Sequence, residues 1–211
     1  MEQGIVLNYF GGVALEFDWA IDFDKVLLEL ARWLLPIGIC LLAEGVCMEK
    51  WRKIEPLSCC RYGTVKMWWR RKYARSLLQG ISVAAVLFIA AIAADVIGAV
   101  DFSGEEWKVF LLWFVHIVLI LSFFLVMDLT RFRKFAPAIL LLLEGVTFLT
   151  GFQSVGAARF MYGMWGMYFQ SNWNLGETGV PVVSSLMFEG VLLVIGYLAG
   201  GSLLKRMIQS R

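Results

Sequence analysis

Five long apolar stretches follow one another along the chain, separated by shorter segments that carry most of the charge. A helix needs about 20 predominantly apolar residues to cross the roughly 30 Å hydrocarbon core of a membrane. The stretches are continuous, whereas the strands of a membrane β-barrel alternate apolar and polar residues. The sequence therefore predicts an all-α, polytopic membrane protein that forms a single transmembrane domain over residues 1–211. The predicted spans cover about residues 26–48, 76–100, 107–129, 136–152 and 182–204.

The overall composition agrees with this prediction. Hydrophobic residues make up 60% of the chain and charged residues 17%, and the mean hydropathy is +0.73. Soluble domains are about half apolar and about a quarter charged. The composition therefore excludes an ordinary soluble domain.

The distribution of Lys and Arg predicts the orientation of the spans. Nine of the 19 lie in residues 49–75, and residues 130–135 and 205–211 bring the total to 15. Cytoplasmic loops of membrane proteins collect Lys and Arg. The loop 101–106 and the N-terminal segment are acidic instead. Five spans then place the N-terminus outside and the C-terminus inside.

Two further segments are not predicted to span the membrane. Residues 1–25 mix apolar side chains with carboxylates, so we expect them to be extracellular or to lie at the membrane surface. Residues 154–173 are rich in glycine and aromatic side chains and carry one charge, Arg159. We interpret them either as an interfacial or re-entrant element on the outer side, or as a simple belt of aromatic side chains.

Several ionisable residues fall within or at the ends of the spans. Charges in hydrocarbon cost several kcal/mol, so such side chains face a cavity, a partner or the interface. Glu144 and Glu189 are the deepest, and each begins a Glu-Gly-Val sequence. They are candidates for a proton-relay or cation site, with hydrogen-bonded packing as the alternative. His116 is expected to be a buried histidine with satisfied hydrogen bonds, in preference to a metal ligand.

Three other carboxylates, Glu44, Asp95 and Asp128, lie near the ends of the predicted spans, where we expect structural roles. Glu44 and Asp128 are near the cytoplasmic ends and are expected to pair with the basic segments. Gly196 and Gly200 are spaced four residues apart in the last span, and small residues at this spacing let helices approach closely. Packing within the chain and a subunit interface are both consistent with that spacing.

The basic segment 49–75 also contains several aromatic residues. Gly63 allows a new helix to start there, and Thr64 is of the residue type that caps helix N-termini. The cations that follow would remain available to lipid phosphates or to an acidic groove on a partner. A lipid-anchoring helix and a docking surface therefore both remain open.

Motifs of common enzymes are absent from the sequence. There is no Gly-x-x-x-x-Gly-Lys phosphate loop, no His-Glu-x-x-His and no Gly-x-Ser-x-Gly. The four cysteines show no zinc or haem spacing. We therefore expect no enzymatic activity, no metal and no cofactor in this chain. Membrane orientation and anionic lipid account for the basic segment, so nucleic-acid binding is not expected.

Residues 17–80 resemble membrane subunits of the ABC-2 type permease group. The likeness is to small permease-like proteins found beside ATP-binding subunits in bacterial peptide-export or immunity systems. In this sequence Val65 stands where the family has a basic residue, and five spans are predicted where the family has six. The resemblance is carried by Glu16-Phe17-Asp18-Trp19, by Trp33-Leu34-Leu35-Pro36-Ile37, and by Arg61-Tyr62-Gly63-Thr64-Val65-Lys66-Met67-Trp68-Trp69, which is similar to the family pattern Arg-aromatic-Gly-Ser-Arg-x-x-Trp.

The resemblance implies a permease subunit in a bacterial plasma membrane, moving a peptide or an amphipathic small molecule. ATP would be hydrolysed by a separate ATP-binding cassette subunit. The other partners would be membrane lipids and a second permease chain, either identical or a sister subunit. The residues expected to couple to the ATPase are Arg61, Tyr62, Lys66, Trp68, Trp69, Arg70 and Arg71.

Two other function classes remain open from the residues alone. An ion-coupled secondary transporter or channel would use Glu144, Glu189 and His116. A non-transporting regulatory or assembly subunit would bind partners through the helix faces that carry small residues. The first would move protons without ATP, and the second would transport nothing.

Overall fold

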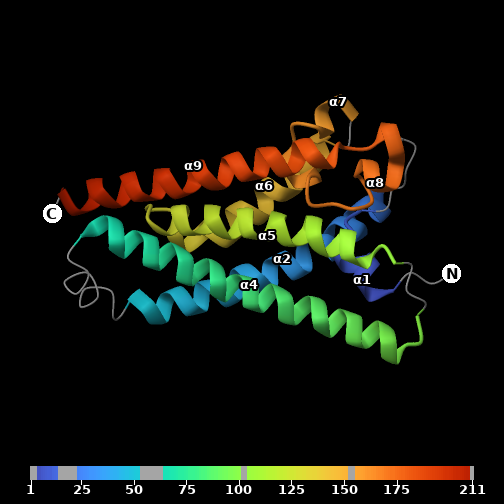
Figure 1. Cartoon of the computed structure of the whole chain (residues 1–211), viewed down its shortest axis with the longest axis horizontal. Coiled ribbons are helices and arrows are strands. Elements are labelled where there is room, and N and C mark those ends of the chain that lie inside the picture. Colours follow the sequence, from blue (N-terminus) through green and yellow to red (C-terminus); the bar gives the residue numbers. More distant parts are fainter. Residues whose placement is uncertain (1–3, 14–22, 53–63, 101–103, 152–154, 210–211) are drawn as a thin grey trace.

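The computed structural model describes residues 4–13, 23–52, 64–100, 104–151 and 155–209. Within these residues, five helices are long and apolar enough to cross a membrane, as predicted, and the chain is an all-α, multi-pass membrane protein. The five helices run alongside one another in a bundle (Figure 1). They are α2 (Phe23–Arg52), α4 (Val65–Ile97), α5 (Glu106–Asp128), α6 (Ala136–Gly151) and α9 (Val182–Gln209).

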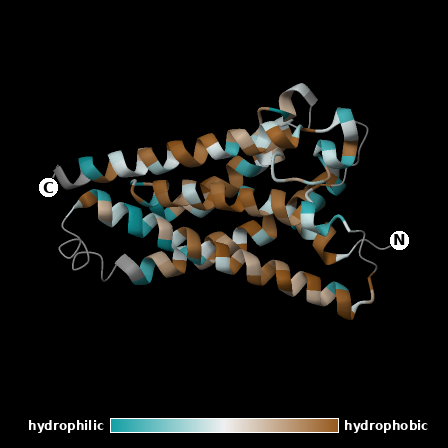
Figure 2. Cartoon of the chain, viewed as in Figure 1, coloured by the Kyte–Doolittle hydropathy of each residue, from teal (hydrophilic) through white to brown (hydrophobic). Residues whose placement is uncertain are grey.

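Helix α5 is the centre of the bundle. Of the most apolar 18-residue stretch of α5, 61% of the residues are buried inside the protein, whereas the same measure gives 22–39% for the other four spans. Those four helices turn large apolar side chains outward, which suits a lipid environment, and their middle parts are mostly hydrophobic (Figure 2). Examples are Leu42 on α2, Leu78 and Ile89 on α4, Leu142 on α6, and Met187 and Leu198 on α9.

Helix α4 begins at Val65, well before the predicted start of its span at residue 76. Thr64 is its N-cap, as predicted, and the Thr64 hydroxyl accepts the backbone N–H of Met67 at 3.3 Å. The charged residues lower the hydropathy of this stretch, but Lys and Arg are good helix formers. Because α2 also continues to Arg52, both flanks of the predicted 49–75 loop are helical, and residues 53–63 lie outside the described part of the chain.

The N-terminal residues are packed into the end of the bundle that the charge distribution predicts to face outside, which is called the outer end below. A short helix, α1 (Ile5–Phe10), has the backbone N–H groups of Ile5 and Val6 bound to the Asp95 carboxylate at 2.6 and 2.9 Å. The Phe10 ring meets Trp113 of α5 edge to face, with 4.7 Å between centroids. Asp95 therefore has the structural role expected for it, because it caps the first helix from a different part of the chain.

Residues 155–181, called the outer segment below, fold over the same end of the bundle. The N–H of Phe169 bonds to the Gly11 carbonyl at 3.0 Å, and the Gln170 side chain donates to the Val13 carbonyl at 2.7 Å. Several large side chains of the segment, Met164, Trp165, Met167 and Tyr168, are buried. Its short elements are α7 (Val155–Ala158), η2 (Tyr162–Met164), α8 (Asn172–Leu175) and η3 (Gly176–Thr178).

Candidate functional site

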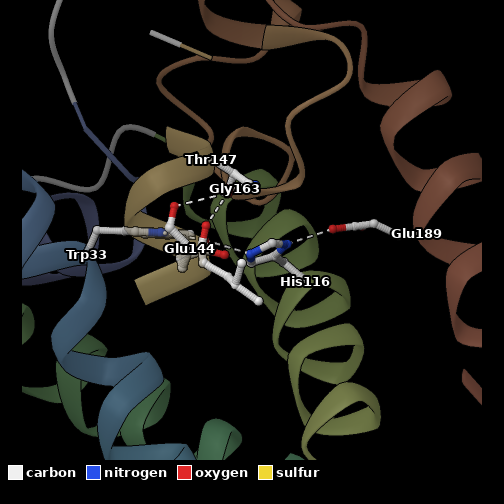
Figure 3. Close-up of polar contacts among 7 residues, drawn as sticks. Trp33, His116, Glu144, Thr147, Gly163 and Glu189 are labelled. Carbon is white, nitrogen blue, oxygen red and sulfur yellow. Dashed lines mark hydrogen bonds and ion pairs between the residues drawn. The ribbon is translucent and has the colours of Figure 1, made fainter. Parts of the chain in front are cut away.

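A histidine lies between two glutamates in the interior of the bundle (Figure 3). His116 Nδ1 is 2.8 Å from Glu189 Oε1, and His116 Nε2 is 2.9 Å from Glu144 Oε1. All three side chains are completely buried. They come from α5, α6 and α9, so three spans meet at one polar point, which we call the His–Glu cluster.

A fourth span reaches the same point. Trp33 on α2 is fully buried, and its indole N–H donates to Glu144 Oε1 at 3.1 Å. An indole N–H is a donor only, so this oxygen must accept from it. The Glu144 carboxyl group therefore receives contacts from α2 and from α5 on a single oxygen atom.

The cluster lies seven to ten residues from those ends of its helices that the charge distribution predicts to face outside. Trp33 and His116 are each ten residues from the outer end of their helices. Glu144 and Glu189 are each seven residues from the outer end of theirs. At about 1.5 Å per residue, these positions correspond to roughly 10–15 Å below the outer ends. In a membrane with a hydrocarbon core about 30 Å thick, such a depth would place the cluster inside that core.

The outer segment covers the cluster directly. The Tyr162 ring stacks on the His116 ring with 6.0 Å between centroids. The N–H of Gly163 bonds to Thr147 Oγ1 at 3.2 Å, one helical turn beyond Glu144 (Figure 3). A Cβ atom on Gly163 would lie 2.6 Å from the Glu144 carbonyl oxygen. The close approach therefore requires glycine at this position.

Within the described part of the chain, one oxygen atom of each glutamate in the His–Glu cluster is left without a hydrogen bond and could carry a proton. Glu144 Oε2 and Glu189 Oε2 are buried and have no hydrogen-bond partner among the described residues. Burial, and then the Glu144 carboxylate, raise the pKa of the Tyr162 hydroxyl above its usual range, so it remains neutral. The two glutamates bind opposite nitrogens of the His116 ring and so do not converge on one point. This arrangement suits the binding of a proton.

A second polar group lies at the inner end of the bundle. Lys72 Nζ is 3.4 Å from Asp128 Oδ2, which is the pairing with a basic segment that the sequence predicted for Asp128. Glu44 instead accepts a hydrogen bond from the Ser76 hydroxyl. These contacts join α2, α4 and α5 at the end of the bundle that is predicted to be cytoplasmic.

The predicted coupling residues separate into two groups on α4. Lys66, Arg70 and Arg71 have exposed side chains. Trp68 and Trp69 are buried instead, since they are 7% and 2% exposed. Arg61 and Tyr62 lie outside the described residues. The exposed cations, which we call the basic face, are thus presented by a helix whose aromatic residues are packed into the bundle.

Trp69 connects the basic face to the last helix. Its indole N–H donates to the Tyr197 carbonyl at 2.9 Å, and its ring packs on Gly200. Gly200 therefore contributes to packing within the chain, which is one of the two roles that its spacing predicted.

The structure brings together all three predicted intramembrane residues, His116, Glu144 and Glu189. It confirms that His116 is buried with both ring nitrogens partnered. Sequence reasoning missed Trp33 and Gly163. The signals were present, since an indole donor inside an apolar span needs an acceptor, and glycine recurs in the outer segment.

Comparison with known proteins finds no relative of this chain. The chain matches no protein-family profile, no curated protein and no solved structure. The resemblance to ABC-2 permeases accordingly stays a prediction. Functional inference rests on the chain's own residues and their geometry.

Proposed function

We propose that this chain is the membrane-spanning subunit of a transporter driven by a separate ATPase. The ATPase docks on the basic face, Lys66, Arg70 and Arg71, at the inner end of α4. A second permease chain completes the transport path, and the substrate is a peptide or an amphipathic small molecule. The observation that carries the proposal is that the basic face is continuous, as one helix, with a membrane span.

Continuity matters because a coupling element has to transmit force. The first turns of α4 are attached to α9 through Trp69 and to α5 through the Lys72–Asp128 ion pair. Motion imposed on the basic face therefore moves three spans together. A flexible loop with the same charges would absorb that motion instead.

The basic face also fits the chemistry of a protein partner. Lys66 and Arg70 are four residues apart and thus share one side of the helix, next to Arg71. Exposed Arg and Lys pair with carboxylates through charge-assisted hydrogen bonds. Anionic lipid offers charges of the same sign, so the test has to separate the two partners.

The proposal is tested by co-expressing the tagged chain with the proteins encoded beside it and asking whether an ATP-binding cassette protein co-purifies. The triple variant K66E/R70E/R71E is expected to lose co-purification of the ATPase while its membrane abundance is unchanged. The matched control is R131E/R133E/K134E, which reverses three charges in the other inner loop and is expected to retain the ATPase.

Three outcomes would contradict the proposal. A wild-type chain that never associates with any co-expressed ATPase overturns it. Full retention of the ATPase by K66E/R70E/R71E shows that the basic face is not its docking surface and leaves anionic lipid as the partner of these cations. Proton flux into liposomes that contain this chain alone, without ATP, identifies an ion-driven transporter through Glu144, Glu189 and His116.

A further inference from the structure

We infer that His116, Glu144 and Glu189 form one proton-exchange site that holds α5, α6 and α9 together in its neutral, two-proton state. The inference does not depend on the proposed ATPase partner. It rests on three ionisable groups in hydrogen-bond contact, all fully buried, on three different spans.

The charges around the cluster show why two protons are needed. Glu144 is the one charged residue of α6, and Glu189 is the one charged residue in residues 182–204 of α9. On α2, the neighbouring charges Glu29 and Arg32 pair with each other at 2.6 Å. A protonated His116 therefore balances one of the two carboxylates, and a second proton is needed to neutralise the other.

The remaining elements that pack against the cluster supply no balancing cation among the described residues. On α5 the other charged residues, Glu106, Lys108 and Asp128, lie at the ends of the helix. In the outer segment the side chains of Arg159 and Glu177 are exposed, and the group facing His116 is the neutral Tyr162 phenol. From α2 the facing group is the Trp33 indole, which is uncharged.

The observed contacts fit the two-proton state. With His116 protonated, both ring nitrogens donate, one to Glu144 and one to Glu189, and the second proton resides on a carboxyl oxygen. With a neutral ring, both glutamates carry a proton: one ring nitrogen donates to a glutamic acid oxygen and the other accepts from the second glutamic acid. Both arrangements hold the same number of protons and the same two hydrogen bonds. Release of one proton leaves an unbalanced negative charge in a dry interior, which disfavours the closed packing.

Proton release would loosen one of two attachments of α9 to its neighbouring helices. The Glu189–His116 contact fastens its outer half to α5. The Trp69–Tyr197 hydrogen bond fastens its inner half to α4. Glu189 and Tyr197 are eight residues apart, or about 12 Å along one helix. Helix α9 is thus bonded at two points, to the proton-exchange site through Glu189 and to the basic end of α4 through Tyr197.

The outer segment controls access to the site from outside. The Tyr162 ring covers His116, and a Cβ on Gly166 would lie 2.5 Å from His116 Cγ. The segment therefore has to shift before water reaches the ring. Proton exchange with the outer side is coupled to that displacement.

The single histidine of the chain makes the inference directly testable. The wild-type protein, labelled with 15N-histidine and reconstituted in liposomes, is titrated with pH by solid-state NMR, and protonated carboxyl groups are followed by infrared spectroscopy. We expect the ring resonances and the carboxyl band to change at the same midpoint, as coupled groups do. Separate midpoints, or a ring that titrates like free imidazole, would overturn the inference.

Variants assign the two contacts. E189Q is expected to shift the Nδ1 resonance, E144Q to shift the Nε2 resonance, and either to remove the pH-dependent carboxyl band. The matched control is E44Q, which changes another buried glutamate of the bundle and should leave the His116 resonances unchanged. Identical His116 spectra in all three variants would refute the site. If a variant fails to fold, the wild-type midpoints of the His116 resonances and of the carboxyl band still test the inference.

Discussion

Trp69 donates its indole N–H to the carbonyl oxygen of Tyr197 at 2.9 Å, across 128 positions in the sequence. The Tyr197 carbonyl belongs to α9, and the Trp69 ring rests on Gly200 one turn further along the same helix. The contact explains why the tryptophan is buried although basic residues surround it in the sequence. It also makes the fit between α4 and α9 sensitive to the smallest added side chain.

Gly200→Ala is expected to destabilise the bundle, because its Cβ would overlap the Trp69 ring. Overpacking of this kind typically costs about 1–3 kcal/mol. The matched control is Gly190→Ala on the same helix, where an added Cβ has no atom within 4 Å. That change should be neutral or stabilise the helix by up to about 1 kcal/mol. Thermal unfolding in detergent measures both, and equal midpoints would contradict the contact.

Glu144→Leu is expected to lower stability much more than Glu144→Gln. Leucine leaves the indole N–H of Trp33 without an acceptor and Nε2 of His116 without a partner, and each buried unsatisfied polar group costs about 1–3 kcal/mol. Glutamine keeps an oxygen in place for both. Denaturant unfolding of the two variants tests the ranking, and a leucine variant as stable as the glutamine variant would show that the oxygen is not needed.

Asp95→Ala is expected to free the N-terminal helix. The Asp95 carboxylate accepts the N–H groups of Ile5 and Val6, and loss of an N-cap typically costs about 0.5–2 kcal/mol. Hydrogen exchange of the α1 amides should therefore accelerate by roughly 2- to 30-fold, since about 1.4 kcal/mol is a factor of ten. Amides in the middle of α9 serve as the internal reference. Unchanged α1 exchange would rule out Asp95 as the cap.

High pH is expected to loosen the outer segment through Tyr168. Burial, and then the hydrogen bond to Glu105, raise the Tyr168 pKa from 10.0 to about 12. Because the folded pKa is above the unfolded value, the stabilisation is complete below pH 10 and is lost as the pH rises towards 12. Glu105→Gln should lower the Tyr168 pKa, because it removes the negative charge that opposes ionisation.

Tyrosinate absorbance measures this titration in the folded protein. Tyr168→Phe identifies the contribution of Tyr168 to the curve, since other tyrosines also ionise at high pH. A curve that is the same with and without Glu105→Gln would contradict the Tyr168–Glu105 contact.

The sequence predicted best those features that depend on neighbouring residues along the chain, namely the membrane spans and a helix N-cap. Five apolar stretches of spanning length predicted five helices, because the hydrocarbon core requires each span to satisfy its own backbone hydrogen bonds. Thr64 was predicted as an N-cap from its residue type alone and is one. The helix that this cap begins at Val65 runs on into the span predicted from residue 76, because hydropathy reports where lipid begins and not where a helix begins.

The candidate site was only half visible in the sequence. His116, Glu144 and Glu189 were each singled out as ionisable residues in apolar spans, since such residues need partners. Their mutual pairing was not predictable, because 28 residues separate His116 from Glu144 and 73 separate it from Glu189. The rotation of each helix about its own axis decides which side chains meet, and that rotation is set by packing against the other helices.

The sequence by itself determined that this protein crosses the membrane, how many times, and which end of the bundle carries its positive charge. These properties depend on transfer of individual residues into lipid and on the charge of each loop, which are local terms. The tertiary structure alone decided that Trp69 is buried against α9 and that His116 lies between two glutamates. Those contacts depend on how four or more helices fit together, because close packing selects one arrangement of side chains that no single segment specifies.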